Sequence, residues 1–215
     1  MTATFRFFLF TIVLLISQQS IHSQRINMDK DVFAFLKTAD TISVVHTTDS
    51  IQFNSDNISE REFVDHIIEK IRKHGDHEMA DSWEKTYKNH TQEIWPAAFV
   101  DELNSRSETY KNPITFVYGN AQTKYQMRIS TVWVYFGYEI GIGQQPAKVS
   151  LEVSFYDTSN PEVILGSTQI KRAMGVYNTE RGDSQNFPNP SVKRVEKAYK
   201  RAGYKFAQAL KRIID

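Results

Sequence analysis

Cysteine is absent from the chain of 215 residues. Without it no disulfide can form, no thiolate can act as a nucleophile, and no lipid can be attached in the manner of a bacterial lipoprotein. An exported domain of this composition must be stabilised by its hydrophobic core, and about 190 residues bury enough surface for that. Export without cysteine fits a bacterial periplasm better than a eukaryotic lumen.

No apolar run is long enough to cross a bilayer, which takes about 20 residues. The longest, from Phe7 to Ile16, follows an early cation, Arg6, and precedes a polar stretch that ends in the small residue Ser23. This order is typical of a secretory signal peptide. We expect residues 1–23 to be a signal peptide and residues 24–215 a single domain, periplasmic or secreted and not integral to the membrane. The alternative is an uncleaved amino-terminal anchor.

The chain also lacks an excess of charge of either sign. Loss of Arg6 with the signal peptide leaves 25 basic and 25 acidic residues. A balanced chain has no overall electrostatic attraction to nucleic acid, which is therefore not an expected partner. The charges are nevertheless segregated, since residues 59–108 carry twelve acidic and seven basic residues whereas the carboxy-terminal segment is basic.

Four helices are predicted from local signals. Ser59 and Glu62 form a capping box, apolar residues then recur at helical spacing, and Gly75 can end this first helix. A third helix begins near Pro96, because proline suits a first turn. The last runs from about Ser191. The apolar residues expected on the buried faces are Phe63, Ile67, Ile68 and Ile71 in the first helix, Met79, Trp83 and Tyr87 in the second, and Phe99, Val100 and Leu103 in the third.

Strands are predicted where apolar residues alternate with polar ones. The first covers residues 40–53, with an interruption near Thr47–Asp49, and others follow Pro113 and occupy residues 149–155 and 163–175. The alternation changes phase between Ile129 and Val132, which predicts a bulge or a break. Residues 177–190, rich in Gly, Asn and Pro, are expected to form a surface loop.

Gly141 and Gly143 raise the question of a phosphate-binding loop. Such a loop needs a helix amino terminus directly after its glycines. Here Gln-Gln-Pro and an alternating strand follow instead. We therefore interpret the glycines as part of a hairpin connection.

Residues 74–81 contain a possible metal-binding pattern. His77-Glu78-Met-Ala-Asp81 resembles the metalloprotease pattern His-Glu-x-x-His with aspartate at the second ligand position, and His74 would add a third ligand. This gives one alternative function, a metal-dependent hydrolase using His74, His77 and Asp81. Gly75 weakens it by breaking the helix between His74 and His77, and the preferred interpretation is a solvated helix face.

Other catalytic patterns are missing from the sequence. There is no Gly-x-Ser-x-Gly nucleophile elbow, and no carboxylate pair can be singled out. His46 lies close to Asp49 in sequence but is expected on an exposed edge rather than in a catalytic triad. We therefore assign no catalytic, cofactor-binding or metal-ligating residue, expect no cofactor, and predict that the protein is not an enzyme.

The last helix combines an apolar stripe with a basic face. Its small stripe residues Ala202 and Ala209 would permit close packing. The preferred interpretation is that this helix covers a sheet, and the alternative is that its cations meet an anionic surface such as phospholipid. The stripe consists of Val192, Val195, Tyr199, Ala202, Phe206, Ala209 and Ile213, and the cations are Lys193, Arg194, Lys197, Lys200, Arg201, Lys205, Lys211 and Arg212.

The order of "FGYEIGIG", "AKVSLEVSFYD", "VILGSTQIK" and the closing "VEKAYKRAGYKFAQAL" resembles uncharacterised bacterial envelope domains related to the TolB amino-terminal domain and CsgG-like proteins. The resemblance covers the layout of residues 40–215. It implies an α+β fold, a two-layer sandwich with a mixed or mainly antiparallel sheet and helices packed on one face. It also implies a non-catalytic binding or assembly role in the periplasm or outer membrane, with an envelope protein or an anionic envelope surface as partner. Many such relatives are lipoproteins, which this chain cannot be.

Overall fold

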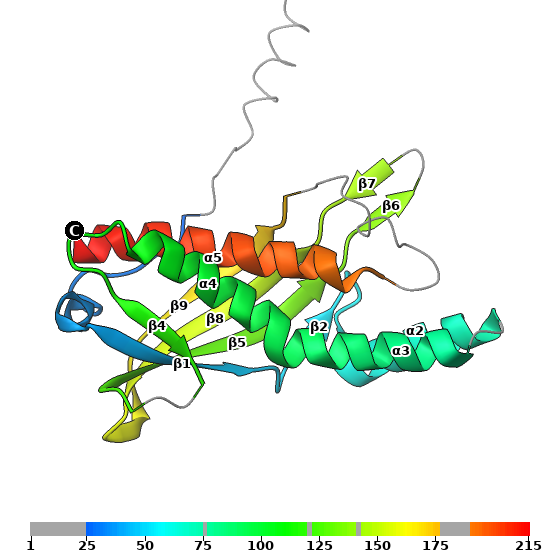
Figure 1. The fold of residues 1–215 in the computed structure, drawn as a ribbon, viewed down its shortest axis with the longest axis horizontal. Coiled ribbons are helices and arrows are strands. Elements are labelled where there is room, and N and C mark those ends of the chain that lie inside the picture. Colours follow the sequence, from blue (N-terminus) through cyan, green and yellow to red (C-terminus); the bar gives the residue numbers. More distant parts are fainter. Residues whose placement is uncertain (1–24, 75–76, 120–121, 141–142, 177–189) are drawn as a thin grey trace, which may run out of the picture.

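The computed structural model describes residues 25–74, 77–119, 122–140, 143–176 and 190–215 (Figure 1). A mixed sheet of seven strands forms one layer, and helices α4 and α5 pack across one of its faces as the second. The implied α+β sandwich is thus confirmed. The signal-peptide residues and the expected loop at 177–190, apart from its last residue, lie outside the described part of the chain.

The long strand β5 is the centre of the sheet. It pairs in parallel with β1 and β2 and antiparallel with β8, while β8 pairs antiparallel with β9, β1 in parallel with β4, and β2 antiparallel with β3. The predicted interruption of the first strand is confirmed as the gap between β1 and β2. The bounds are β1 Thr41–Thr47, β2 Gln52–Phe53, β3 Ile58–Ser59, β4 Thr115–Tyr118, β5 Tyr125–Tyr135, β8 Lys148–Asp157 and β9 Asn160–Met174.

A second, two-stranded sheet flanks residues 141–142, which lie outside the described part of the chain, and its second strand begins at Gly143. β6 (Tyr138–Ile140) pairs antiparallel with β7 (Gly143–Gln145), which confirms the hairpin prediction. Gly137 precedes the hairpin with a φ of +69°, and a side chain there would collide with the backbone of Gln145. Glycine is required at this position because it has no Cβ atom to collide and because it adopts a positive φ without strain.

The predicted change of phase in β5 is a bulge. The register against β8 shifts between Thr131 and Trp133. As a result Thr131 is buried against the helical layer, where its hydroxyl contacts Tyr199 of α5, whereas Trp133 is half-exposed and donates to the carbonyl of Asn54. Because the bulge adds one residue to β5, the side chains of Thr131 and Trp133 hydrogen-bond to different partners.

The helix α2 (Glu60–Lys73) begins as predicted. The Ser59 hydroxyl accepts from the amide of Glu62, and the Glu62 carboxylate accepts from the amide of Ser59 at 2.9 Å. The second helix, α3 (His77–Asn89), buries Ala80, Trp83 and Tyr87. Met79, predicted on that face, is 39% exposed, so this assignment is wrong. Ala80 replaces it because positions 80, 83 and 87 share one helical face.

The helix α4 (Trp95–Ser107) starts beside Pro96 as predicted, but no break separates it from α3. A π-helical segment, His90–Ile94, joins the two. The hydroxyl of Thr91 donates to the carbonyl of Tyr87 at 2.9 Å inside this segment. The wider π turn accommodates Pro96, which has no amide hydrogen and cannot donate a helical hydrogen bond. In Figure 1, α3 and α4 form a single long, bent rod.

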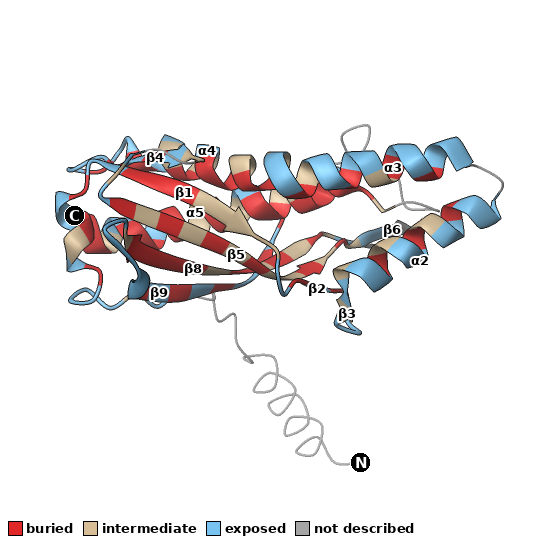
Figure 2. Cartoon of the chain, turned by 90° about the horizontal axis from the view of Figure 1, so that it is seen from below, coloured by how far each residue is buried: buried red, intermediate tan, exposed pale blue. Residues whose placement is uncertain are grey.

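An aromatic cluster attaches the α2–α3 hairpin to the sheet. Phe53 of β2 stacks on Phe63 of α2 with ring centroids 4.5 Å apart, and Phe63 also stacks on Phe136 at 5.0 Å. Such pairs add about 0.5–1.5 kcal/mol each beyond the buried area. Beyond this cluster the hairpin projects from the end of the sheet, and its tip is largely exposed (Figure 2).

The helix α5 (Val192–Ile214) buries every residue of the predicted stripe. The buried face is wider than predicted and also includes Ala198, Gly203, Ala207 and Leu210. The reason is that α5 is covered on two sides, by the sheet and by α4. The closest approach lies at Gly203, where a Cβ would collide with the carbonyl oxygen of Phe99.

Replacing Gly203 by alanine is therefore expected to destabilise the protein even though alanine favours helices. Overpacking costs about 1–3 kcal/mol, and the gain in helix propensity of about 1 kcal/mol offsets only part of it. Thermal and urea unfolding should show a lower midpoint for Gly203→Ala. Gln208→Ala, at an exposed position of the same helix, should leave the midpoint nearly unchanged. Equal stability of the two variants would contradict the close crossing.

Candidate functional site

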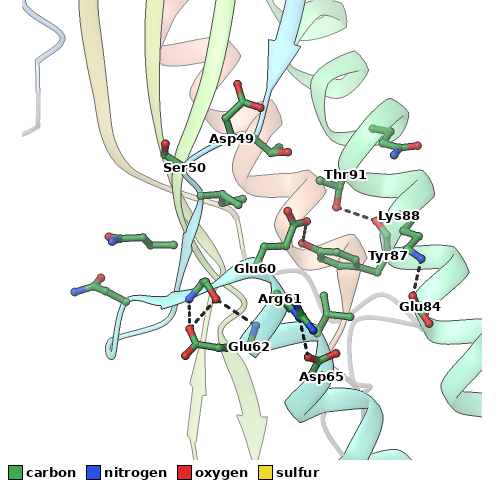
Figure 3. Close-up of a pocket in the computed structure, with 17 residues that line it drawn as sticks. Asp49, Ser50, Glu60, Arg61, Glu62, Asp65, Glu84, Tyr87, Lys88 and Thr91 are labelled. Atoms are coloured by element: carbon green, nitrogen blue, oxygen red, sulfur yellow. Dashed lines mark hydrogen bonds and ion pairs between the residues drawn. The ribbon is translucent and has the colours of Figure 1, made fainter.

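An open groove with a volume of about 950 Å³ lies at the base of the α2–α3 hairpin (Figure 3). Three parts of the chain line it: the segment between β1 and β2, the start of α2, and the end of α3 with the π-helical segment. These parts meet because the aromatic cluster fixes the hairpin against β2. The π turn contributes Thr91 and Gln92 to the lining.

The groove is acidic. Five of its lining residues carry carboxylates and two carry cations. A cationic ligand is therefore favoured over an anionic one. The acids are Asp49, Glu60, Glu62, Asp65 and Glu84, and the cations are Arg61 and Lys88.

Tyr87 and Glu60 join the two walls of the groove. The Tyr87 hydroxyl donates to a carboxylate oxygen of Glu60 at 2.6 Å (Figure 3). Burial, and then this hydrogen bond to Glu60, raise the pKa of Tyr87 well above its usual range. The phenol therefore stays protonated and acts as a fixed donor, not as a base.

Most other charged groups of the lining are held by neighbours. Lys88 bonds Glu84 at 2.6 Å, and Arg61 lies 3.7 Å from Asp65. Glu62 belongs to the capping box, and its hydrogen bonds to the Ser59 side chain and backbone lower the pKa of its carboxyl. These pairs are exposed and can exchange partners at little cost, since surface ion pairs contribute about 0–1 kcal/mol. The arrangement suits reversible recognition of a charged segment.

The sequence signalled the elements of this groove but not the groove itself. The capping box located Glu60 and Glu62, and helical spacing located Tyr87. Nothing local indicated that the segment after β1 would face α3. The π turn, which sets that geometry, has no sequence signature comparable to a capping box.

The residues considered for a metal site are not brought together. Asp81 is ion-paired to Arg72 at 3.1 Å, and the Nδ1 atom of His74 lies 2.8 Å from the carbonyl oxygen of Lys70 at the end of α2. His77 is exposed at the start of α3. Among the described residues, no group of three or more His, Asp or Glu side chains is placed to hold a metal ion. The hydrolase alternative gains no support from the structure.

His46 lies under the helical layer and not on an exposed edge, so that expectation was wrong. Its Nε2 atom is hydrogen-bonded to the Thr131 hydroxyl at 2.8 Å, and Thr131 is bonded in turn to the hydroxyl of Tyr199 at 2.5 Å. The chain of bonds links β1, the bulge of β5, and α5. Burial lowers the pKa of His46 to about 4. Burial also raises the pKa of the Tyr199 phenol.

No helix in the part of the chain that the structure describes is long and apolar enough to span a membrane.

Comparison with known proteins gives no family. No family model matches the chain, and no curated protein matches it. Among solved structures, the PelC dodecamer from Paraburkholderia phytofirmans is similar with a TM-score of 0.31 at 11% identity, over 78% of this chain and 88% of that one. A putative neuraminyllactose-binding hemagglutinin homolog from Helicobacter pylori is similar with a TM-score of 0.32 at 12% identity, over 83% and 84%. Likeness this distant indicates no function, and the resemblance to TolB-related and CsgG-like domains stays a prediction.

The stability of the protein should depend on pH through His46. In the unfolded chain the imidazole takes up a proton near pH 6.5, whereas in the folded protein it stays neutral until about pH 4. Between these values the unfolded state binds more protons, so the free energy of unfolding should fall as the pH drops, by up to about 3 kcal/mol. The loss should be smaller in His46→Gln. An NMR titration of the folded protein tests this directly, and a His46 midpoint near 6.5 would contradict it.

Proposed function

We propose that the protein is an exported, non-catalytic binding module of the bacterial cell envelope, and that the acidic groove of the α2–α3 hairpin receives a basic segment of another envelope protein. The signal-peptide pattern of residues 1–23 supports export. The groove supports a binding role, and it is the observation that carries the proposal.

Three properties of the groove favour a polypeptide segment as its ligand. It is open to solvent and has a volume of about 950 Å³, so a chain segment can bind there without being enclosed. Its carboxylates outnumber its cations, which favours lysine and arginine side chains. Two of its walls, the start of α2 and the end of α3, belong to the hairpin that projects from the end of the sheet (Figure 1).

The groove can be tested by removing charges that do not maintain the fold. Asp49→Asn, Asp65→Asn and Glu84→Gln leave the capping box and the Tyr87–Glu60 bond in place. In the producing cells, cross-linking of the exported wild type should recover a discrete partner from the periplasmic or outer membrane fraction. The triple variant should recover about tenfold less, because three exposed charge pairs contribute about 0.5 kcal/mol each.

A matched control separates the groove from general charge. Asp31→Asn, Glu108→Gln and Glu162→Gln remove the same charge at exposed positions outside the groove. This triple should recover the partner as the wild type does. Equal recovery by both triples would place the interface elsewhere, and a chain retained in the cytoplasm would refute export.

A second candidate function is peripheral binding of an anionic lipid surface through α5. The cations of this helix, except the buried Arg194, are exposed or half-exposed. Lys200 lies 4.0 Å from Glu102 and Lys211 lies 3.7 Å from Asp215, and both contacts are exposed enough for an anionic surface to compete. Each cation near such a surface adds about 1 kcal/mol before screening.

Liposome sedimentation tests this candidate. Binding to vesicles that contain phosphatidylglycerol should weaken with salt and fall at least about tenfold in the variant Lys197→Gln, Lys200→Gln, Arg201→Gln. The control Lys37→Gln, Lys70→Gln, Lys85→Gln removes as many exposed cations from other elements and should bind normally. Unchanged binding by the α5 variant would count against the candidate.

A further inference from the structure

The first described residues are held between α5 and the edge strand β9. A guanidinium nitrogen of Arg212 donates to the carbonyl of Ile26 at 3.2 Å, and the hydroxyl of Thr168 donates to the carbonyl of Asn27 at 2.6 Å. Ile26 is only 6% exposed. The backbone that carries Arg25 is therefore fixed from both sides, although the Arg25 side chain is at the surface.

Two hollows meet at Arg25. The first, of about 400 Å³, lies between this segment, β9 and α5, and its charged lining consists of Arg25, Lys171 and Lys205. No carboxylate is among the residues that line it. Three cations from three separate parts of the chain thus converge on one concave surface.

The second hollow, of about 520 Å³, lies on the other side of Arg25 and adds Lys30, Lys211 and Arg212. Its one carboxylate, Asp215, lies 3.7 Å from Lys211 and accepts from the amide of Lys111 at 3.0 Å. Asp215 is thus engaged at the end of α5.

Two cations of the hollows, Arg212 and Lys205, are half-buried and each lies near another positive charge. Burial, and then the charge of Arg25, lower the pKa of Arg212. Burial, and then the charge of Arg201, lower the pKa of Lys205. Like charges gathered in partly buried positions repel, and a bound anion would relieve that repulsion.

We propose that Arg25, Lys171 and Lys205 form a binding site for a phosphate-bearing anion, and that a second phosphate of the same ligand reaches Lys30 and Arg212 across Arg25. The guanidinium fork of arginine matches two phosphate oxygens, and lysine adds compact positive charge. The hollows are separate from the acidic groove, so this site does not depend on the partner proposed above. Neither hollow is lined by Lys197, Lys200 or Arg201, the residues mutated in the test of lipid binding by α5.

Titration calorimetry with pyrophosphate tests the site on the protein recovered after export. We expect one molecule bound per chain at submillimolar Kd in low salt, and weaker binding of inorganic phosphate. Lys171→Gln with Lys205→Gln should weaken pyrophosphate binding at least tenfold. The control Lys197→Gln with Lys200→Gln removes two cations of α5 that line neither hollow and should bind as the wild type does. Circular dichroism spectra and unfolding midpoints should confirm that both double variants fold.

Vesicles distinguish a free phosphate compound from a lipid headgroup. Pyrophosphate binding without vesicle binding identifies a small phosphorylated ligand. Binding to phosphatidylglycerol vesicles that is lost in Lys171→Gln with Lys205→Gln identifies a headgroup, and either result supports the site. Absence of both kinds of binding, or equal losses in the two double variants, would overturn it. Loss of vesicle binding only on mutation of Lys197, Lys200 and Arg201 would support the α5 candidate and not this site.

Discussion

The close crossing of α4 and α5 is the constraint on which the rest of the molecule depends. Gly203 lets α5 approach the carbonyl of Phe99, and Phe99 packs on Phe206 with ring centroids 5.9 Å apart. At this separation α5 contacts α4 and the sheet at once, so its whole apolar face is buried. The same crossing holds α4 in place, and α4 continues through the π turn into α3. A contact in the middle of the helical layer therefore sets the position of the groove wall.

Charge is sorted along the molecule although its sum is close to zero. The acidic groove is lined by the hairpin, and the cationic hollows around Arg25 are lined by residues within 205–215, in and just after the carboxy-terminal half of α5. In Figure 1 the carboxy-terminal end of α5 and the α2–α3 hairpin lie toward opposite ends of the long axis. A neutral protein with separated charges is oriented by an electric field even though it is not drawn along it. Beside a charged surface the domain would therefore present one end and direct the other away.

Features that depend on residues close together in the chain were predictable from the sequence. The capping box of Ser59 and Glu62 and the bulge after Ile129 each depend on a few neighbouring positions. Features that depend on distant contacts were missed. Gly203 resembles any other helix glycine until its position opposite Phe99 is known, and helical spacing alone did not show that Ala80 is buried in place of Met79. His46 looked exposed because neither Thr131 nor Tyr199 is near it in sequence. The candidate groove was missed for the same reason, since it exists only where three separate segments meet.

The burial of Ile26 bears on whether cleavage of the signal peptide precedes or follows docking of the segment around Ile26. It lies three residues after Ser23, and Arg212 and Thr168 bind the backbone at and beside it. A protease must hold several residues in an extended, accessible form on both sides of the bond it cuts. If the leader is removed after Ser23, the cut must precede docking of this segment, because the finished domain would shield the site.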